Sequence, residues 1–230
     1  MTLVAQKQPL LVAAASDLAP LEKPLRDLYK KTYNRELRLV LGSSGMLATQ
    51  IRNSAPYDVF LSANLQFVRD LEASSYVLPG SVRVYAAGRL AIWSKSLSIK
   101  TMDLLADPRI THIAIANPKH APYGLAAHQA MERARIWEQV KGKVVLAENV
   151  RQCLQYAESG NAQVALLAWS LVFSRGGVLL PESLHDPILQ AGGVVAGSSR
   201  RAAAADLLDL LVSPHGRALL SRYGFFPMQK

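Results

Sequence analysis

The chain has 230 residues, and its 26 lysines and arginines outnumber its 17 aspartates and glutamates, which gives a net charge of +9. Half of the residues are apolar and 7% are aromatic, so the sequence encodes a folded protein with a sizeable core and excludes a disordered chain. Cys153 is the only cysteine, which excludes a disulfide within one chain. No apolar run reaches the roughly 18 residues of a membrane-spanning helix.

Short apolar runs alternate with helical patterns along the chain, which is typical of βαβ units. Strands are predicted at 10–15, 37–41, 59–61, 90–94, 110–116, 144–147, 164–169 and 193–196. Helices are predicted over about 21–29, 46–52, 65–72, 124–140, 150–158, 202–212 and after Pro214. So many strands fit two α/β lobes better than one sheet. We expect residues 1–85 and 193–230 to form lobe I, residues 86–192 to form lobe II, and a hinge near 84–89 and 189–194.

The positive charge alone would suit an anionic partner. The basic residues are scattered, however, and no basic stripe with interleaved aromatics, helix-turn-helix or zinc-finger spacing is present. We therefore expect no nucleic-acid partner. The five histidines show no metal-ligand spacing, so we expect neither a metal cation nor a cofactor.

Four strand-to-helix junctions carry small residues and neutral hydrogen-bond donors. They lie at Ser16-Asp17, at Gly-Ser-Ser-Gly 42–45, at 117–124 and at 148–151, where Asn149 precedes Val150. Helix N-termini collect unpaired N–H groups and partial positive charge, so they bind anions without lysine or arginine. Each junction taken singly is also consistent with a plain cap or turn. Together, two in each half of the chain, they suit one small anion held between two lobes.

Six blocks of sequence, in order, are VAAAS at 12–16, GSSG at 42–45, APYDVFLSA at 55–63, NPKHAPYG at 117–124, ENVR at 148–151 and YGF at 223–225. In order and spacing they resemble the periplasmic molybdate-binding proteins of ABC transporters over nearly the whole chain. The resemblance implies a two-lobed periplasmic-binding-protein fold of type II. Each lobe would be a mixed sheet flanked by helices, with molybdate or tungstate in the cleft between the lobes.

The resemblance also assigns site residues. Ser16 and Ser44 match serines that give hydroxyl and N–H donors, while Tyr123 and Val150 match positions that give backbone N–H donors. The Tyr123 hydroxyl is a further hypothesis, since Ala168 stands where some members have a tyrosine. Asp17 would repel a dianion, so we expect its carboxylate to point away and only its backbone N–H to contribute.

The implied partner is an ABC transporter permease, and the implied location is the periplasm. We expect that an export signal was removed before Met1. Whether the protein is also anchored to the membrane is left as an open alternative. We expect a monomer without catalytic residues. Two alternatives stay open: a solute-binding protein for sulfate or another tetrahedral oxyanion, and a serine hydrolase that uses Ser44 with His120. The second is disfavoured because Met46 stands where the G-x-S-x-G elbow requires glycine.

Overall fold

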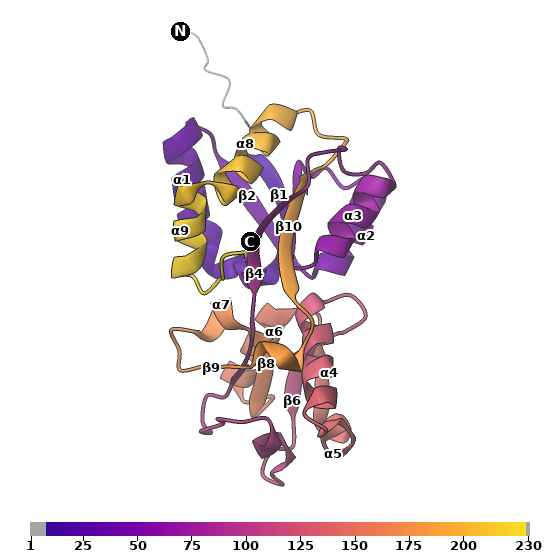
Figure 1. The fold of residues 1–230 in the computed structure, drawn as a ribbon, viewed down its shortest axis with the longest axis vertical. Helices are drawn as coiled ribbons and strands as arrows, with labels where there is room; N and C mark the ends of the chain where they lie inside the picture. Colours follow the sequence, from indigo (N-terminus) through magenta and orange to yellow (C-terminus); the bar gives the residue numbers. More distant parts are fainter. Residues whose placement is uncertain (1–7, 229–230) are drawn as a thin grey trace.

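The alternating strands and helices build two sheets in the computed structural model, which describes residues 8–228 (Figure 1). The first sheet has the strand order β2-β1-β3-β10-β4, and we call it, with its helices, lobe I. Its strands β1 to β3 run parallel, whereas β10 is antiparallel to both of its neighbours. The strand bounds are Leu10–Ala15 (β1), Leu37–Gly42 (β2), Val59–Ser62 (β3), Arg83–Gly88 (β4) and Ile188–Val194 (β10).

The second sheet has the order β7-β6-β8-β5-β9, and with its helices it forms lobe II. Strand β6 runs parallel to β7 and β8, and β5 is antiparallel to β8 and β9. The bounds are Leu90–Trp93 (β5), Ile113–Ala116 (β6), Val144–Ala147 (β7), Val164–Ala168 (β8) and Val178–Leu179 (β9). Both sheets are therefore mixed, as the resemblance implied.

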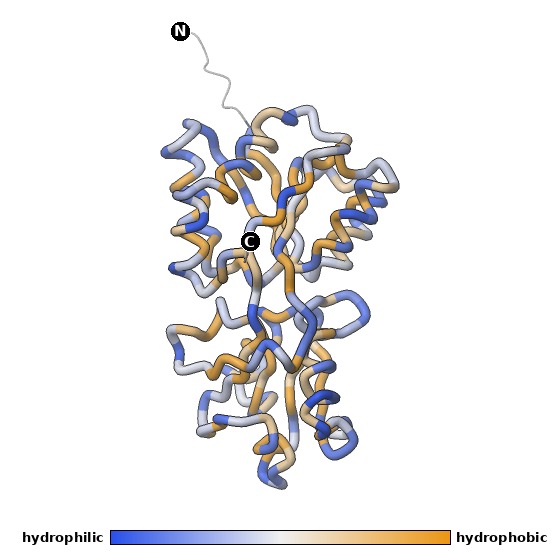
Figure 2. Tube along the Cα trace, viewed as in Figure 1, coloured by the Kyte–Doolittle hydropathy of each residue, from blue (hydrophilic) through white to orange (hydrophobic). Residues whose placement is uncertain are grey.

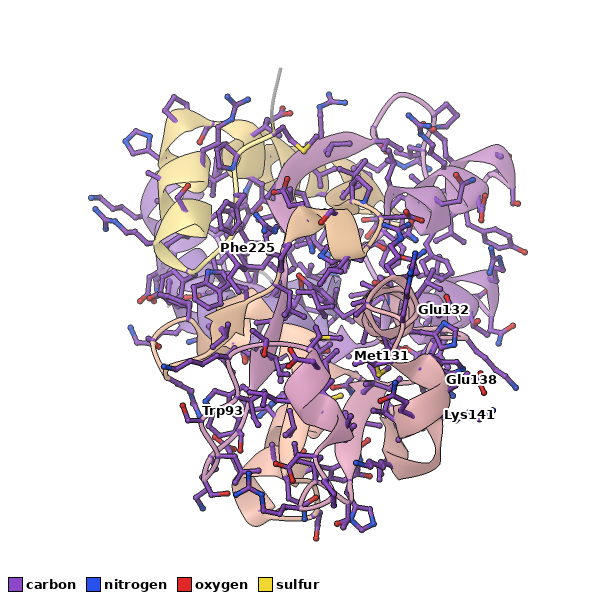
Figure 3. All side chains as sticks on the ribbon, turned by 60° about the horizontal axis from the view of Figure 1, so that its bottom comes forward. Trp93, Met131, Glu132, Glu138, Lys141 and Phe225 are labelled. Atoms are coloured by element: carbon purple, nitrogen blue, oxygen red, sulfur yellow. The ribbon has the colours of Figure 1, made fainter. Side chains whose placement is uncertain are left out.

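Helices cover both sheets with their apolar sides, so that hydrophobic residues follow the strands and hydrophilic ones the outer turns (Figure 2). In lobe I they are the 3-10 helix η1 (Ser16–Leu21), α1 (Glu22–Tyr33), α2 (Ser44–Arg52), α3 (Leu65–Ala73), α8 (Arg201–Val212) and α9 (Pro214–Arg222). In lobe II they are α4 (Pro122–Arg133), α5 (Trp137–Val140), α6 (Val150–Ser159) and α7 (Trp169–Val172), with short 3-10 turns at Asp103–Ala106, Lys141–Lys143 and Glu182–Leu184. Figure 3 shows Met131, which is fully buried, on the inner side of α4 and its exposed neighbour Glu132 at the periphery.

The two lobes are joined by β4 and β10, which lie side by side and run in opposite directions between the upper and the lower lobe (Figure 1). The lobe boundaries predicted at 85/86 and 192/193 fall inside these two strands. That division of the chain, and the hinge at the same place, remain predictions. Among the described residues no helix has the length and apolar character needed to cross a membrane. The segment before residue 8, which bears on the export signal, lies outside the described residues.

Several expected elements differ from the structure. The strand expected at 193–196 is β10, which begins five residues earlier, at Ile188. Strand β4 was not predicted as a strand, and its residues were expected only as part of the hinge near 84–89. The single helix expected over 124–140 is two helices, because Arg135 between them adopts a left-handed φ of 58°. The reasons are local: β10 contains Gly192 and Gly193, which dilute a strand pattern, and a left-handed arginine gives no sequence signal.

Candidate functional site

All five residues expected at the site line one small cavity between the lobes. It is small, with a volume of about 10 Å³ for the centre of a water-sized sphere, and lies beyond the carboxyl ends of β1 and β2 in lobe I and of β6 and β7 in lobe II. Carboxyl ends of parallel strands are where open α/β sheets place ligands. The lining residues are Ala15, Ser16, Asp17, Gly42, Ser43, Ser44, Ala63, Ala121, Pro122, Tyr123, Asn149 and Val150.

Four helices begin at this cavity, two from each lobe: η1, α2, α4 and α6. Within residues 8–228, the backbone N–H groups of Ser16, Ser44, Tyr123 and Val150 donate to no backbone carbonyl. Side-chain caps that would normally satisfy such groups are missing at η1, α2 and α4. The cavity therefore collects unpaired donors and the positive ends of four helices.

The Ser44 hydroxyl is held in a defined role by its neighbour. Its oxygen accepts a hydrogen bond from the backbone N–H of Ala63 at 3.0 Å, and the side chain is fully buried. Because that bond uses the oxygen as an acceptor, the hydroxyl proton stays available to a ligand. Ser16, 4% exposed, lies directly after β1 at the start of η1. Lobe I thus offers two hydroxyls in addition to its backbone donors.

In lobe II the N–H donors lie at the first residues of the helices α4 and α6. Asn149 caps α6 by accepting from the N–H groups of Arg151 and Gln152, at 3.0 and 3.2 Å, which leaves the N–H of Val150 for the cavity. At the start of α4, a Cβ on Gly124 would lie 2.0 Å from the carbonyl oxygen of Ala116. Glycine is therefore required for α4 to begin so close to the end of β6, and this approach places Tyr123 at the cavity.

The lobes touch directly at one side of the cavity. The N–H of Gly45 donates to the carbonyl oxygen of His120 at 2.9 Å, and Nδ1 of His120 lies 2.8 Å from the Ser43 hydroxyl. His120 is thus paired with Ser43, whereas the Ser44 hydroxyl faces Ala63. The pair on which the hydrolase alternative rested, Ser44 with His120, is not formed.

Asp17 and Tyr123 form a second contact between the lobes. The Tyr123 hydroxyl donates to Asp17 Oδ2 at 3.0 Å, and Gln190 Nε2 donates to the same oxygen at 2.8 Å. In this structure the Tyr123 hydroxyl is donated to Asp17, and the hypothesis that it serves the ligand remains a prediction. Burial raises the pKa of the Asp17 carboxyl to about 6, against the hydrogen bonds from Tyr123 and Gln190 and, to a smaller extent, the backbone N–H groups of Asp17 and Leu18, which lower it.

Several residues of the site were not expected from the sequence. Asn149 was expected only as a cap, and Ser43, Ala63 and Gln190 had no assigned role. Only Asn149 carried a usable signal, its position before an apolar helix. Ala168, at the end of β8, is buried and does not line the cavity.

The electrostatics of the lining are unusual for an anion site. The lining contains no lysine or arginine, and its one charged residue is Asp17. Within the described part of the chain no group of three or more His, Cys, Asp or Glu side chains could hold a metal cation. Attraction for an anion must therefore come from hydrogen-bond donors and helix dipoles.

Two mixed α/β lobes with a donor-lined cavity between them define a two-lobed solute-binding protein of the periplasmic type II fold. Residues 10–226 match the family model described as bacterial extracellular solute-binding protein, and the chain belongs to this family.

Named relatives agree with this class. The chain is 30% identical to the molybdate-binding protein of Rhodobacter capsulatus over 229 residues, covering 98% of this chain and 91% of the relative. The solved structure of the periplasmic molybdate-binding protein of Azotobacter vinelandii superposes with a TM-score of 0.91 at 28% identity, covering 96% of this chain and all of that chain. The sulfate-binding protein of Mycobacterium tuberculosis, with a TM-score of 0.81, 13% identity and coverage of 96% of this chain and 88% of that one, shares the fold.

Proposed function

We propose that this chain binds molybdate or tungstate in the cavity between its lobes and delivers the oxyanion to the permease of an ABC transporter. The observation that carries the proposal is the set of free N–H groups from four helix starts, together with the hydroxyls of Ser16 and Ser44, around a cavity without a cationic side chain. Full-length similarity to molybdate-binding proteins of two bacteria supports this choice of ligand.

Neutral donors are sufficient for such a ligand. A tetrahedral dianion offers four oxygen atoms that only accept hydrogen bonds, and about two donors per oxygen match their lone pairs. Hydrogen bonds to a charged partner are about twice as strong as neutral ones. Each helix start adds roughly 0.3–1 kcal/mol of favourable dipole interaction. The four free N–H groups and the two serine hydroxyls supply six donors of this kind to the four oxygens.

The same chemistry sets the selectivity. Hydrogenphosphate carries a proton that would face another donor, so a site made of donors disfavours it. Sulfate has the right charge and shape but shorter bonds, so a fixed ring of donors loses contacts to it. Molybdate and tungstate are nearly equal in size and should bind alike. A sulfate-binding protein is the second candidate, because the sulfate-binding relative has the same fold.

Binding is coupled to closure in this proposal. The donors come from both lobes, so an open cleft would leave half of them unmatched, and the strands β4 and β10 supply the hinge. The transporter then distinguishes the closed from the open shape. The protein acts as a monomer outside the cytoplasmic membrane, in the periplasm, and no residue is assigned a catalytic role.

Isothermal titration with a panel of oxyanions tests the proposal. Molybdate and tungstate should bind tightly with similar affinity, sulfate much more weakly, and phosphate without measurable heat. Equal affinity for sulfate would favour the second candidate. Absence of binding by molybdate and tungstate would refute the proposed function.

A further inference from the structure

Asp17 is a buried carboxyl group in the wall of a cavity assigned to a dianion. Its side chain is 0% exposed, and among the described residues it forms no ion pair. Oδ2 accepts from Tyr123 and Gln190, whereas Oδ1 is buried and has no hydrogen-bond partner in the described part of the chain. A buried ionised carboxylate with one unpartnered oxygen is costly, and a nearby dianion raises that cost further.

The groups that face Asp17 cannot neutralise it. Tyr123 of α4 and Tyr85 of β4 are uncharged, since burial raises the pKa of each phenol well above its usual value. Gln190 of β10 donates to the carboxylate, and Ser170 of α7 donates to the Asp17 backbone carbonyl at 2.8 Å.

Charged side chains near the cavity do not reach the carboxylate. Arg151 of α6 lines the neighbouring groove and forms no ion pair with Asp17, and His120 is hydrogen-bonded to Ser43. From α1, β1 and β2, which also pack against η1, no charged side chain hydrogen-bonds to Asp17 in the described structure.

We propose that Asp17 takes up one proton from solvent when the dianion binds, so that the closed, occupied site contains a neutral carboxylic acid. The O–H bond forms on the carboxyl group, and no other bond changes. Once protonated, the Asp17 carboxyl can donate a hydrogen bond, as the other groups of the site do, and it no longer repels the ligand. This inference rests on the proposed function and makes Asp17 a determinant of affinity and selectivity.

The proton on Asp17 determines whether the site accepts protonated or only fully deprotonated oxyanions. An ionised Asp17 would accept the hydrogen of a protonated oxyanion such as hydrogenphosphate, whereas a protonated Asp17 offers only a donor at its hydroxyl. Protonation of Asp17 therefore keeps the site selective for fully deprotonated dianions. The pKa of about 6 for the carboxyl without ligand means that it is mostly ionised at neutral pH, so the proton must be acquired during binding.

The test is calorimetric titration with sodium molybdate at about pH 7.5 in two buffers of different protonation enthalpy. The heat difference between the buffers gives the number of protons taken up. We expect about one proton for the unaltered protein, none for Asp17→Asn and one for the control Asp27→Asn, an exposed aspartate paired with Lys23. Circular dichroism checks that Asp17→Asn is folded.

A second measurement needs no variant. One linked proton should weaken the affinity of the unaltered protein by about tenfold for each pH unit above roughly pH 7. Tight molybdate binding with no proton uptake would overturn this inference and leave the proposed function intact. Uptake that persists in Asp17→Asn would assign the proton to another group, such as His120, and would also overturn it. Absence of molybdate heat would instead refute the proposed function.

Discussion

The backbone N–H of Gly45 in lobe I donates to the carbonyl oxygen of His120 in lobe II, at 2.9 Å. A Cβ on Gly45 would lie 2.9 Å from the Cα, Cβ and carbonyl oxygen of His120. The lobes can therefore meet at this point only because residue 45 has no side chain. This contact lies beside the cavity, and in the proposed closure of the cleft it is a point where the two lobes meet.

Replacement of Gly45 by alanine should hold the lobes apart. The added methyl group meets backbone atoms of His120, which cannot move away as a flexible side chain would. We expect at least about tenfold weaker molybdate binding, a loss of roughly 1.4 kcal/mol. Titration measures the affinity, and small-angle X-ray scattering with ligand should show a more open shape. The control is Gly142→Ala, where nothing lies within 4 Å of the new Cβ. Unchanged affinity in Gly45→Ala would contradict the role of this contact in closure.

Ser44→Ala should remove one hydroxyl donor and leave the fold in place. A hydrogen bond to a charged group is worth about 1.5–3 kcal/mol, so molybdate should bind roughly 10–150-fold more weakly. Ser81→Ala is the matched control, because the Ser81 oxygen also accepts a backbone N–H, that of Val194 at 3.1 Å, away from the cavity. If both variants lowered affinity equally, a direct role for Ser44 would be refuted.

Asn149→Ala should affect stability and binding together. Loss of the α6 cap costs about 1 kcal/mol of stability, and the N–H groups of Arg151 and Gln152 then compete with Val150 for the anion. Ser213→Ala removes a comparable cap, on α9, by the loss of its bond to the Gly216 N–H. Thermal denaturation should show similar destabilisation in both variants, while only Asn149→Ala weakens binding. A similar loss of affinity in Ser213→Ala would show a general effect of destabilisation.

Asp17 should also make the stability of the unliganded protein depend on pH. Its pKa is raised from 3.8 to about 6 in the folded protein, mainly by burial. The folded state therefore binds more protons than the unfolded state between these values, and the free energy of unfolding should fall as pH rises from about 4 to 6. Asp17→Asn should flatten this part of the profile and be more stable near pH 7 by about 1–3 kcal/mol. Urea denaturation at several pH values provides the measurement. If the free energy of unfolding depended on pH in the same way in the unaltered protein and in Asp17→Asn, Asp17 would not be buried in its charged form.

The sequence predicted the parts of the site that depend on local chain geometry. Ser16, Ser44 and Val150 each follow a strand and open a helix, and this pattern is readable because caps and glycine turns have strong residue preferences. The cavity that these residues share required the two lobes to be placed together. Only the resemblance to a family supplied that information before the structure.

Contacts between residues far apart in the sequence could not be read from it. Gln190 and Asp17 are 173 residues apart, and their hydrogen bond depends on where β10 crosses between the lobes. Ser43 and His120, which come from different lobes, are likewise 77 residues apart. Strand β10 itself was misplaced because a buried glutamine and two glycines do not form a typical strand pattern.

The pairing of β4 with β10 has a topological consequence. Gly88 and Ile188 are partners in the register of these strands, so the chain leaves lobe I and returns to it at neighbouring points. Everything from residue 89 to residue 187 is thus an insertion between two adjacent strands of one sheet. A short turn could link those strands directly. The donors proposed at Tyr123 and Val150 therefore lie in one continuous inserted segment, and those at Ser16 and Ser44 lie in the sheet that flanks it.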